Sequence, residues 1–387
     1  MITRATLFVM FASFSTGCGL FAPVVGALPN DVSGEVVCEA APTCDALFVP
    51  PVRPAHLAAL RGPDDACGTA GRAPEVLSVT ADTVIDADML GCIDLTVEVV
   101  GEGSTPCVLT VEGEALGFAR LHVRSARLPV ELHLEVARVE QSEISVEGPV
   151  DVFLDDVDTV ASRIVLESLA PLAAPSLSLD GGLMTDVEIR GARAEVHVEN
   201  TQVRRVIAQV HAIVLDRARV QESGIQADVV EMLAAELTGS DLDVTHLVAA
   251  AGTLGTTHIT RCSEVTLSQL TVVGSFIAAC DSPIDARDVG FESTVIAGDV
   301  VGLRGSLRHS VFGGARLALP DGEVFASAFC GTTSVDAGEV VCVRCGSRAP
   351  ADMCGTVSAS AELCPGLCAS TCSASGEPTM PAEECAS

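Results

Sequence analysis

The sequence predicts an all-β fold, a β-solenoid of about 11 coils, over residues 76–330. Two observations predict it. Aliphatic residues in near alternation return at an almost regular interval between about residues 110 and 330, and 48% of the chain is hydrophobic although Trp and Tyr are absent. A core of Val, Leu, Ile and Ala suits strands, because β-branched side chains pack well on a pleated surface.

Each repeat has two halves. An aliphatic pair opens the coil, and two further aliphatic residues follow four to six positions apart, as in Val220 with Ile225. One coil alone buries too few side chains to offset the entropy of ordering its backbone, so successive coils have to stack. Ten steps cover 187 residues, which gives a mean period of 18.7. The first halves begin near Val130, Val150, Leu177, Val196, Ile213, Val230, Leu247, Val265, Ile284, Val301 and Leu317.

Two other architectures fit parts of this pattern. A helix over residues 208–254 is suggested by dense Ala, Leu and Val, but the β-branched content and the unbroken phase of the repeat favour strands. A left-handed hexapeptide helix would have rigid coils of about 18 residues, whereas the steps here vary from 16 to 27, the longest carrying the loop from Leu169 to Pro175. The chain therefore resembles the right-handed parallel β-helix family over about 200 residues, because that fold tolerates unequal coils.

The N-terminus reads as an export signal. Arg4 supplies a positive charge, and residues 5–14 form an apolar stretch of ten, too short for a bilayer span of roughly 20 residues. The ending Ser15-Thr16-Gly17-Cys18 resembles a bacterial lipobox, although Ser15 stands where Leu is usual. That resemblance implies cleavage between Gly17 and Cys18 and lipid attachment to the thiol of Cys18. The alternative is an ordinary signal sequence whose cysteine joins a disulfide.

Lipidation would place the chain in a bacterial envelope. Several acyl chains on Cys18 make membrane anchoring stable, and Gly19 rather than Asp follows, which by the same resemblance favours the outer membrane. We expect a signal peptide at 1–17, then a lipidated tether and Cys-bearing N-terminal cap at 18–75. The solenoid follows, and a Cys-rich cap and tail occupies residues 331–387.

The chain has 16 cysteines, which in an exported protein predict disulfides because that compartment is oxidising. Setting Cys18 aside leaves 15, so one thiol is free or pairs between molecules. Cys262 and Cys280 are 18 residues apart and occupy similar phases of successive coils. Stacked strands lie about 4.8 Å apart, within disulfide reach, so a bridge is predicted; two buried free thiols are the alternative.

The C-terminal cysteines read as a disulfide framework. The pair Cys342-x-x-Cys345 could also suggest zinc or redox chemistry, but an isolated pair in a disulfide-rich segment favours structural pairing. The series Cys364, Cys368 and Cys372 has no His beside it.

No catalytic or metal site is predicted, and no cofactor. Two acidic clusters could bind Ca²⁺, which takes several oxygen ligands, but they also suit solvated corners in a chain with 52 acidic residues. His246 and His258 lie less than one coil apart and should not stack. The acidic clusters are Asp155, Asp156 and Asp158, and Asp281, Asp285 and Asp288.

Charge and composition limit the function. The formal net charge of −30 argues against nucleic acid as a partner, since phosphates would be repelled. We expect a non-catalytic, lipid-anchored envelope protein that acts as a rigid acidic display or protein-interaction scaffold. A polysaccharide lyase or glycoside hydrolase is one alternative, disfavoured because Lys and Tyr are absent and no Trp could stack on sugars. A calcium-dependent adhesin is another.

Overall fold

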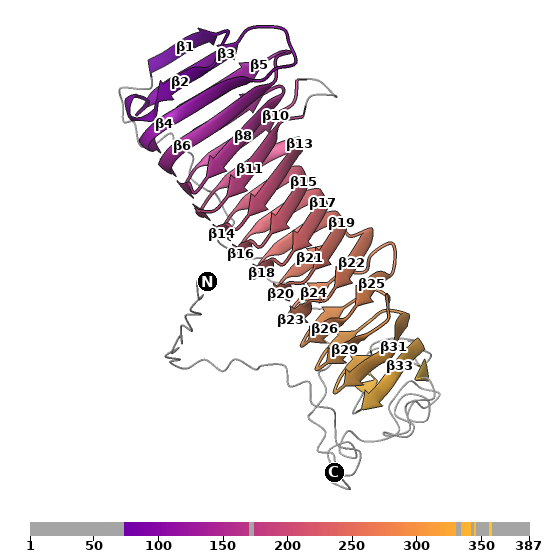
Figure 1. The fold of residues 1–387 in the computed structure, drawn as a ribbon. Coiled ribbons are helices and arrows are strands. Elements are labelled where there is room, and N and C mark those ends of the chain that lie inside the picture. The colour runs from indigo at the N-terminus through magenta and orange to yellow at the C-terminus, as the bar shows by residue number, and fades with distance from the viewer. Residues whose placement is uncertain (1–72, 170–173, 330–333, 342–343, 346–355, 358–387) are drawn as a thin grey trace, which may run out of the picture. The chain divides into compact units, whose positions relative to one another are not determined.

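The computed structural model describes residues 73–169, 174–329, 334–341, 344–345 and 356–357. The chain divides into two units, residues 1–36 and 37–387, and every described residue lies in the second. The described part is an all-β parallel solenoid of about 13 turns, with one short 3-10 helix, η5 (Ala87–Met89). Figure 1 shows the coils following one another from β1 to β33. The solenoid fold predicted from the sequence is confirmed.

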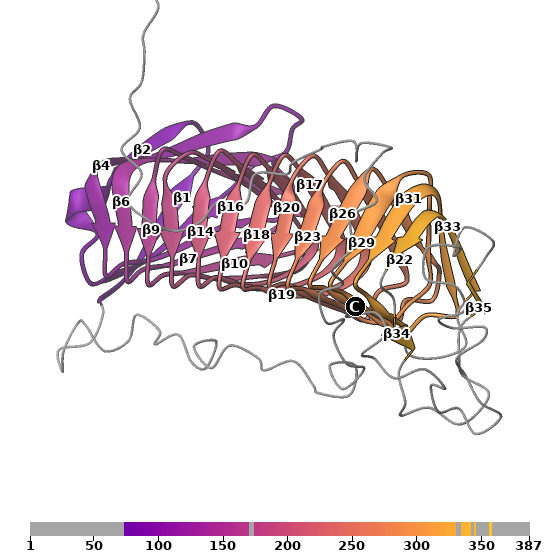
Figure 2. The ribbon, with the colours of Figure 1, turned by 90° about the horizontal axis from the view of Figure 1, so that it is seen from below.

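Each coil contributes strand segments to three parallel ladders, which we call faces A, B and C in chain order. Figure 2 shows the coils in succession from another side. Face A consists of β1 (Ala73–Val79), β3 (Ile93–Val99), β5 (Arg120–Ser125), β7 (Glu143–Glu147), β10 (Arg163–Glu167), β21 (His258–Thr260), β24 (Phe276–Ile277), β27 (Val295–Ile296), β30 (Val311–Phe312), β32 (Ala328–Phe329), β34 (Arg344–Cys345) and the first parts of four longer strands. Those four continue from face A onto face B: β13 (Glu188–Glu199), β15 (Ile207–Asp216), β17 (Gly224–Leu233) and β19 (Asp241–Ala250).

The other two faces are built in the same way. Face B adds β2 (Thr83–Asp86), β8 (Val150–Asp155), β11 (Ser176–Asp180), β22 (Glu264–Ser268), β25 (Ile284–Arg287), β28 (Val300–Gly302) and β35 (Thr356–Val357). Four strands run from face B onto face C: β4 (Cys107–Gly117), β6 (Val130–Glu140), β31 (Arg316–Phe325) and β33 (Ser334–Val341). Face C adds β9 (Asp158–Val160), β12 (Leu183–Thr185), β14 (Gln202–Arg204), β16 (Arg219–Gln221), β18 (Glu236–Thr238), β20 (Thr253–Gly255), β23 (Thr271–Val273), β26 (Val289–Glu292) and β29 (Gly305–Arg308).

The register explains the repeat in the sequence. The predicted first halves begin on face B, where Val196 pairs with Ile213, Ile213 with Val230, and Val230 with Leu247. One start was misplaced by a residue: Val300, not Val301, pairs with Ile284 and is fully buried. Val130 and Val150 lie two residues before Leu132 and Val152, which are the positions in register with Leu177. The helix considered over residues 208–254 is excluded, because β15 to β20 occupy that stretch.

The solenoid extends further than the repeat indicated. Strands β1 to β5 add coils before residue 130, where the spacing is longer and irregular: Thr83 pairs with Leu109, and Cys107 with Val130. Strands β33 to β35 continue the ladders beyond residue 330. The estimate of 11 coils was therefore low. Among the described residues, the structure has no helix with the length and apolar character that a membrane crossing requires.

A column of buried hydroxyl side chains runs along the corner between faces C and A. Each hydroxyl donates to the carbonyl oxygen two residues earlier, and seven of the nine accept a backbone N–H from the preceding coil. They satisfy buried peptide groups at the turn, which would otherwise destabilise the fold. The members of this corner column are Ser142, Ser162, Ser223, Ser240, Thr257, Ser275, Thr294, Ser310 and Ser327.

Candidate functional site

The structure joins Cys262 and Cys280 in a disulfide, with 4.7 Å between their Cα atoms. Cys262 follows β21 and Cys280 follows β24, which pair in register on face A. Among the described residues Cys107 is a free, buried thiol. Burial raises the pKa of the Cys107 thiol above its ordinary value, and the negative charge of Asp82 raises it further. This thiol is therefore protonated and shielded from solvent. Cys18, Gly17 and the cysteines predicted to form the C-terminal framework lie outside the residues whose side chains are described.

The first acidic cluster does not converge on one point. Asp155 ends β8 and pairs in register with Asp180, while the Asp156 backbone turns the corner with a positive φ of 55°. Asp158 accepts a hydrogen bond from the Leu183 backbone N–H at 3.0 Å.

The second cluster is divided in the same way. Asp281 accepts a hydrogen bond from the Ser263 hydroxyl at 2.7 Å, and Asp285 pairs with Arg287 at 2.8 Å. Asp288 lies at a corner with a positive φ of 55°. Within the described part of the chain, no group of three His, Cys, Asp or Glu side chains is placed to hold a metal ion.

Ion pairs join successive coils on faces A and C and at the corner between them. On face A, Arg163 lies between Glu143 at 3.7 Å and Glu188 at 2.8 Å. On face C, Arg308 contacts Glu323 at 2.7 Å, and at the corner between faces C and A Arg205 donates two hydrogen bonds to Asp186. On face B, Arg287 pairs with Asp285 within one strand.

An acidic column forms where face B meets the corner to face C. Asp155 pairs in register with Asp180, Asp180 with Glu199, and Glu199 with Asp216. Like charges in register on neighbouring strands repel, and Asn200 and Arg217 reduce that repulsion by contacting Asp180 and Glu199. This column presents negative charge along four successive coils.

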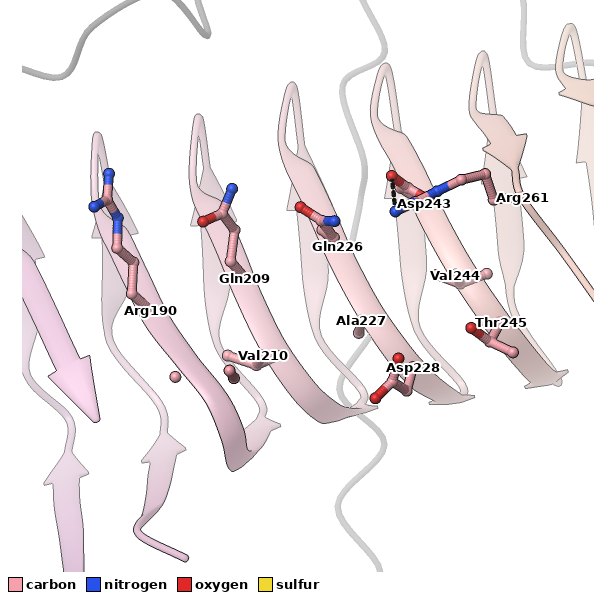
Figure 3. Close-up of a pocket in the computed structure, with 12 residues that line it drawn as sticks. Arg190, Gln209, Val210, Gln226, Ala227, Asp228, Asp243, Val244, Thr245 and Arg261 are labelled. Carbon is pink, nitrogen blue, oxygen red and sulfur yellow. Dashed lines mark hydrogen bonds and ion pairs between the residues drawn. The ribbon is translucent and has the colours of Figure 1, made fainter. Parts of the chain in front are cut away.

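A depression of the surface lies on face A across β13, β15, β17 and β19 and has a volume of about 620 Å³ (Figure 3). Small and buried residues form its floor, namely Gly191, Val210, Ala227 and Val244. The register of β13 shifts between Gly191 and Glu195, which bends the chain at one end. Long polar side chains project beside one another from successive coils: Arg190, Gln209, Gln226, Asp243 and Arg261 (Figure 3).

Charge at both ends of this depression is already paired. Arg190 Nε donates to Glu188 at 2.6 Å, and Arg261 donates two hydrogen bonds to Asp243. Those bonds and the charge of Asp243 raise the pKa of the Arg261 guanidinium. Between the two arginines, the exposed amides of Gln209 and Gln226 make no side-chain hydrogen bond to the described residues. They are free to donate to and accept from a ligand.

One histidine beside the depression has a carboxylate partner. His211 Nδ1 lies 2.9 Å from Asp228 Oδ2, and both side chains are largely exposed. Thr245 follows Asp228 by one 17-residue coil, so the carboxylate stands between the histidine and the hydroxyl. A hydroxyl–histidine–carboxylate relay needs the histidine in the middle. This arrangement therefore suits hydrogen bonding to a ligand rather than activation of a nucleophile.

The two histidines considered from the sequence lie apart, as expected. His246 is on the face B part of β19, whereas His258 opens β21 on face A and lies 3.0 Å from Asp241. The face A depression was not identified from the sequence. Its signal is the spacing of Gln209, Gln226 and Asp243, each 17 residues after the last, which becomes meaningful only once the coil length is known.

Comparison with protein-family models, curated protein sequences and solved structures finds no match.

Proposed function

We propose that this protein is a non-catalytic scaffold of the bacterial cell envelope, anchored to the outer membrane by lipid on Cys18, which binds a protein partner on face A. The observation that carries the proposal is the distribution of charge. Arg163, Arg308 and Arg205 are each paired with carboxylates of neighbouring coils, on face A, on face C and at the corner between these faces. Catalysis needs charged groups gathered around one reacting point; a display surface needs them spread out and paired.

The face A depression supplies the contact surface in this proposal. Its floor is rigid, because each floor residue belongs to a strand hydrogen-bonded to both neighbours. Gln209 and Gln226 offer amide groups that carry no charge, while Arg190 pairs with Glu188, which also contacts Arg163, and Arg261 pairs with Asp243. A neutral polar protein surface matches these groups, since a charged ligand would have to displace an existing ion pair.

The acidic column supports selectivity. Asp155, Asp180, Glu199 and Asp216 repel other acidic surfaces. The column lies at the corner between faces B and C, away from face A, so it disfavours adsorption there without reaching the face A depression.

The anchor is tested by expressing the full chain with Cys18→Ser and, as the matched control, with Ser15→Leu, which restores the usual lipobox residue. We expect the Cys18→Ser protein to leave the membrane fraction and the Ser15→Leu protein to remain there. A mass consistent with acyl chains on the mature N-terminus should be found only in the second. Membrane retention of Cys18→Ser protein without acyl mass would contradict lipid anchoring.

The same purified protein distinguishes the alternatives. Turnover of an acidic polysaccharide, measured by reducing-end release or by absorbance of unsaturated product, would establish the enzyme instead. A rise in melting temperature with millimolar Ca²⁺ that chelator reverses would favour the adhesin. The scaffold proposal predicts no turnover and no shift in melting temperature.

A further inference from the structure

The face A depression carries two rows of side chains along the solenoid axis. In the first row, Arg190 pairs in register with Gln209, Gln209 with Gln226, and Gln226 with Asp243. Each step is one coil, about 4.8 Å, and Figure 3 shows the four side chains projecting one beside the next. The row therefore runs from a cation through two amides to an anion.

The second row lies two residues further along the same strands. His211 in β15 and Asp228 in β17 occupy corresponding positions, because the residues on either side of them pair in register. Alternate residues of a strand point to the same side of a sheet, so both project from face A. The two side chains are 47% and 65% exposed, and the contact between them involves Nδ1 of the histidine. The second ring nitrogen and the carboxylate can each bond a further group.

The first row is complementary to itself when its order is reversed. A two-fold axis in the plane of contact, running along the strands between β15 and β17, sets a second copy antiparallel on face A. This axis keeps the row opposite itself but inverts the order of the coils. Arg190 then faces Asp243 of the second copy, and Gln209 faces its Gln226. An amide both donates and accepts, so two amides satisfy each other.

The second row meets the same requirement about the same axis. His211 faces Asp228 of the second copy, so the two histidines and the two carboxylates alternate around the axis. A closed two-fold interface uses the same patch on both copies, so that patch has to complement itself. If the two solenoids lay parallel instead, each coil would face its own equivalent, and neither Arg190 nor His211 would meet its carboxylate. The charges therefore favour the antiparallel arrangement.

Charge in the depression is balanced, although the chain as a whole is strongly acidic. The lining contains two basic residues, Arg190 and Arg261, and two acidic residues, Asp228 and Asp243, whereas the whole chain carries −30. Two copies can therefore approach each other here with little of the repulsion that acts elsewhere. No existing pair has to break, because Asp243 already accepts from Arg261 and a carboxylate has room for a second arginine.

Two other features set the strength of this contact. Glu188 and Asp241 also face each other, but each already contacts a basic side chain of its own chain. Four coils are about 19 Å long, and a patch of that length is smaller than the roughly 800 Å² per partner of a standard protein interface. We therefore expect a reversible dimer rather than a permanent one.

We propose that face A binds a second copy of this chain, antiparallel about a two-fold axis between β15 and β17. This assignment rests on the proposed function, since it names the partner of the same surface. Each copy offers Arg190 to the other's Asp243 and His211 to the other's Asp228, so each contact forms twice. Two scaffolds thereby join through face A and leave faces B and C outside the contact.

Opposite charge reversals test the contact in sedimentation velocity. The full chain with Cys18→Ser serves as the parent, so that lipid does not drive association, and we expect it to dimerise as its concentration rises. Arg190→Asp and Asp243→Arg each bring like charges together twice across the axis. Each alone should raise the dissociation constant at least about tenfold. Mixing the two variants should restore the parent's affinity, because opposite charges again meet at positions 190 and 243.

The matched controls reverse an ion pair on face C. Arg219 lies 3.6 Å from Glu236, and Arg219→Asp and Glu236→Arg should leave the dissociation constant unchanged. Circular dichroism checks that every variant is folded. If Asp243→Arg protein does not fold, a photo-reactive amino acid at position 209 serves instead. Purified protein should then give an adduct of twice the chain mass, linked to the tryptic peptide of residues 220–261.

The outcomes distinguish the dimer from the proposed function. A parent chain that stays monomeric, a mixture that binds no tighter than either variant, absence of the position 209 adduct, or an equal loss from the face C controls would overturn the second copy as the partner. If position 226 still gives an adduct with a different protein in intact cells, the scaffold proposal stands without the dimer. Neither dimer nor adduct would overturn both.

Discussion

Replacing Ser240 with alanine tests whether the corner column stabilises the coils. The Ser240 hydroxyl is 1% exposed, accepts a hydrogen bond from the Ser223 backbone N–H at 3.1 Å and donates one to the Thr238 carbonyl at 3.0 Å. Alanine removes both bonds and leaves the buried N–H of Ser223 without its acceptor. A buried donor without a partner destabilises a protein by about 1–3 kcal/mol. We expect the free energy of unfolding to fall by that amount.

The assay is urea denaturation followed by circular dichroism, combined with hydrogen exchange at the Ser223 amide. Since about 1.4 kcal/mol corresponds to a tenfold change in an equilibrium constant, that amide should exchange about 5- to 150-fold faster. The control is Ser178→Ala on β11, whose half-buried hydroxyl makes no side-chain hydrogen bond to the described residues. Equal effects of the two substitutions would refute a stabilising role for the column.

Three further predictions follow from burial and covalent structure. Leu254→Ala, at a fully buried site, should lower the free energy of unfolding by about 2–5 kcal/mol in urea titrations. Leu233→Ala, at a site that is 53% exposed, should change it by less than about 0.5 kcal/mol. A similar loss from both would contradict the assignment of Leu254 to the core and of Leu233 to the surface. Because burial raises the pKa of the Cys107 thiol, Cys107 should resist alkylation at pH 8 and react only after denaturation; rapid labelling of the folded chain would show that β4 is misplaced. Joint replacement of Cys262 and Cys280 by Ser opens a link between residues 18 apart and should cost about 3 kcal/mol; an unchanged urea midpoint would show that the bond contributes nothing.

The stacked fold could be predicted because the inward positions of every coil need aliphatic residues. That requirement leaves a periodic signal, as in the register-paired positions Ile213, Val230 and Leu247. The position of Val300 was missed because Val301 beside it is also aliphatic, and alternation alone does not distinguish the inward residue from its neighbour. The first coils lie within the predicted range of residues 76–330 but were not counted as repeats, because the register steps there are longer than the mean period.

The corner column and the face A depression could not be predicted in the same way. A serine such as Ser240 is polar and reads as a surface residue, yet its position directly after Gly239, which has a positive φ of 60°, buries it. Gln209 and Gln226 come together only through the register. The disulfide between Cys262 and Cys280 could be predicted because their spacing equals one coil and both lie in the same phase of the repeat.

Site-specific photo-cross-linking in intact cells tests the central claim, that face A binds a protein partner. Cross-linkers that react with lysine do not suit a chain without Lys. A photo-reactive amino acid therefore replaces Gln226 on face A in one variant and, as the control, Gln221 on face C, five residues earlier, in the other. The account predicts one discrete adduct from position 226 and none from position 221. No adduct from position 226, or equal adducts from both positions, would contradict it.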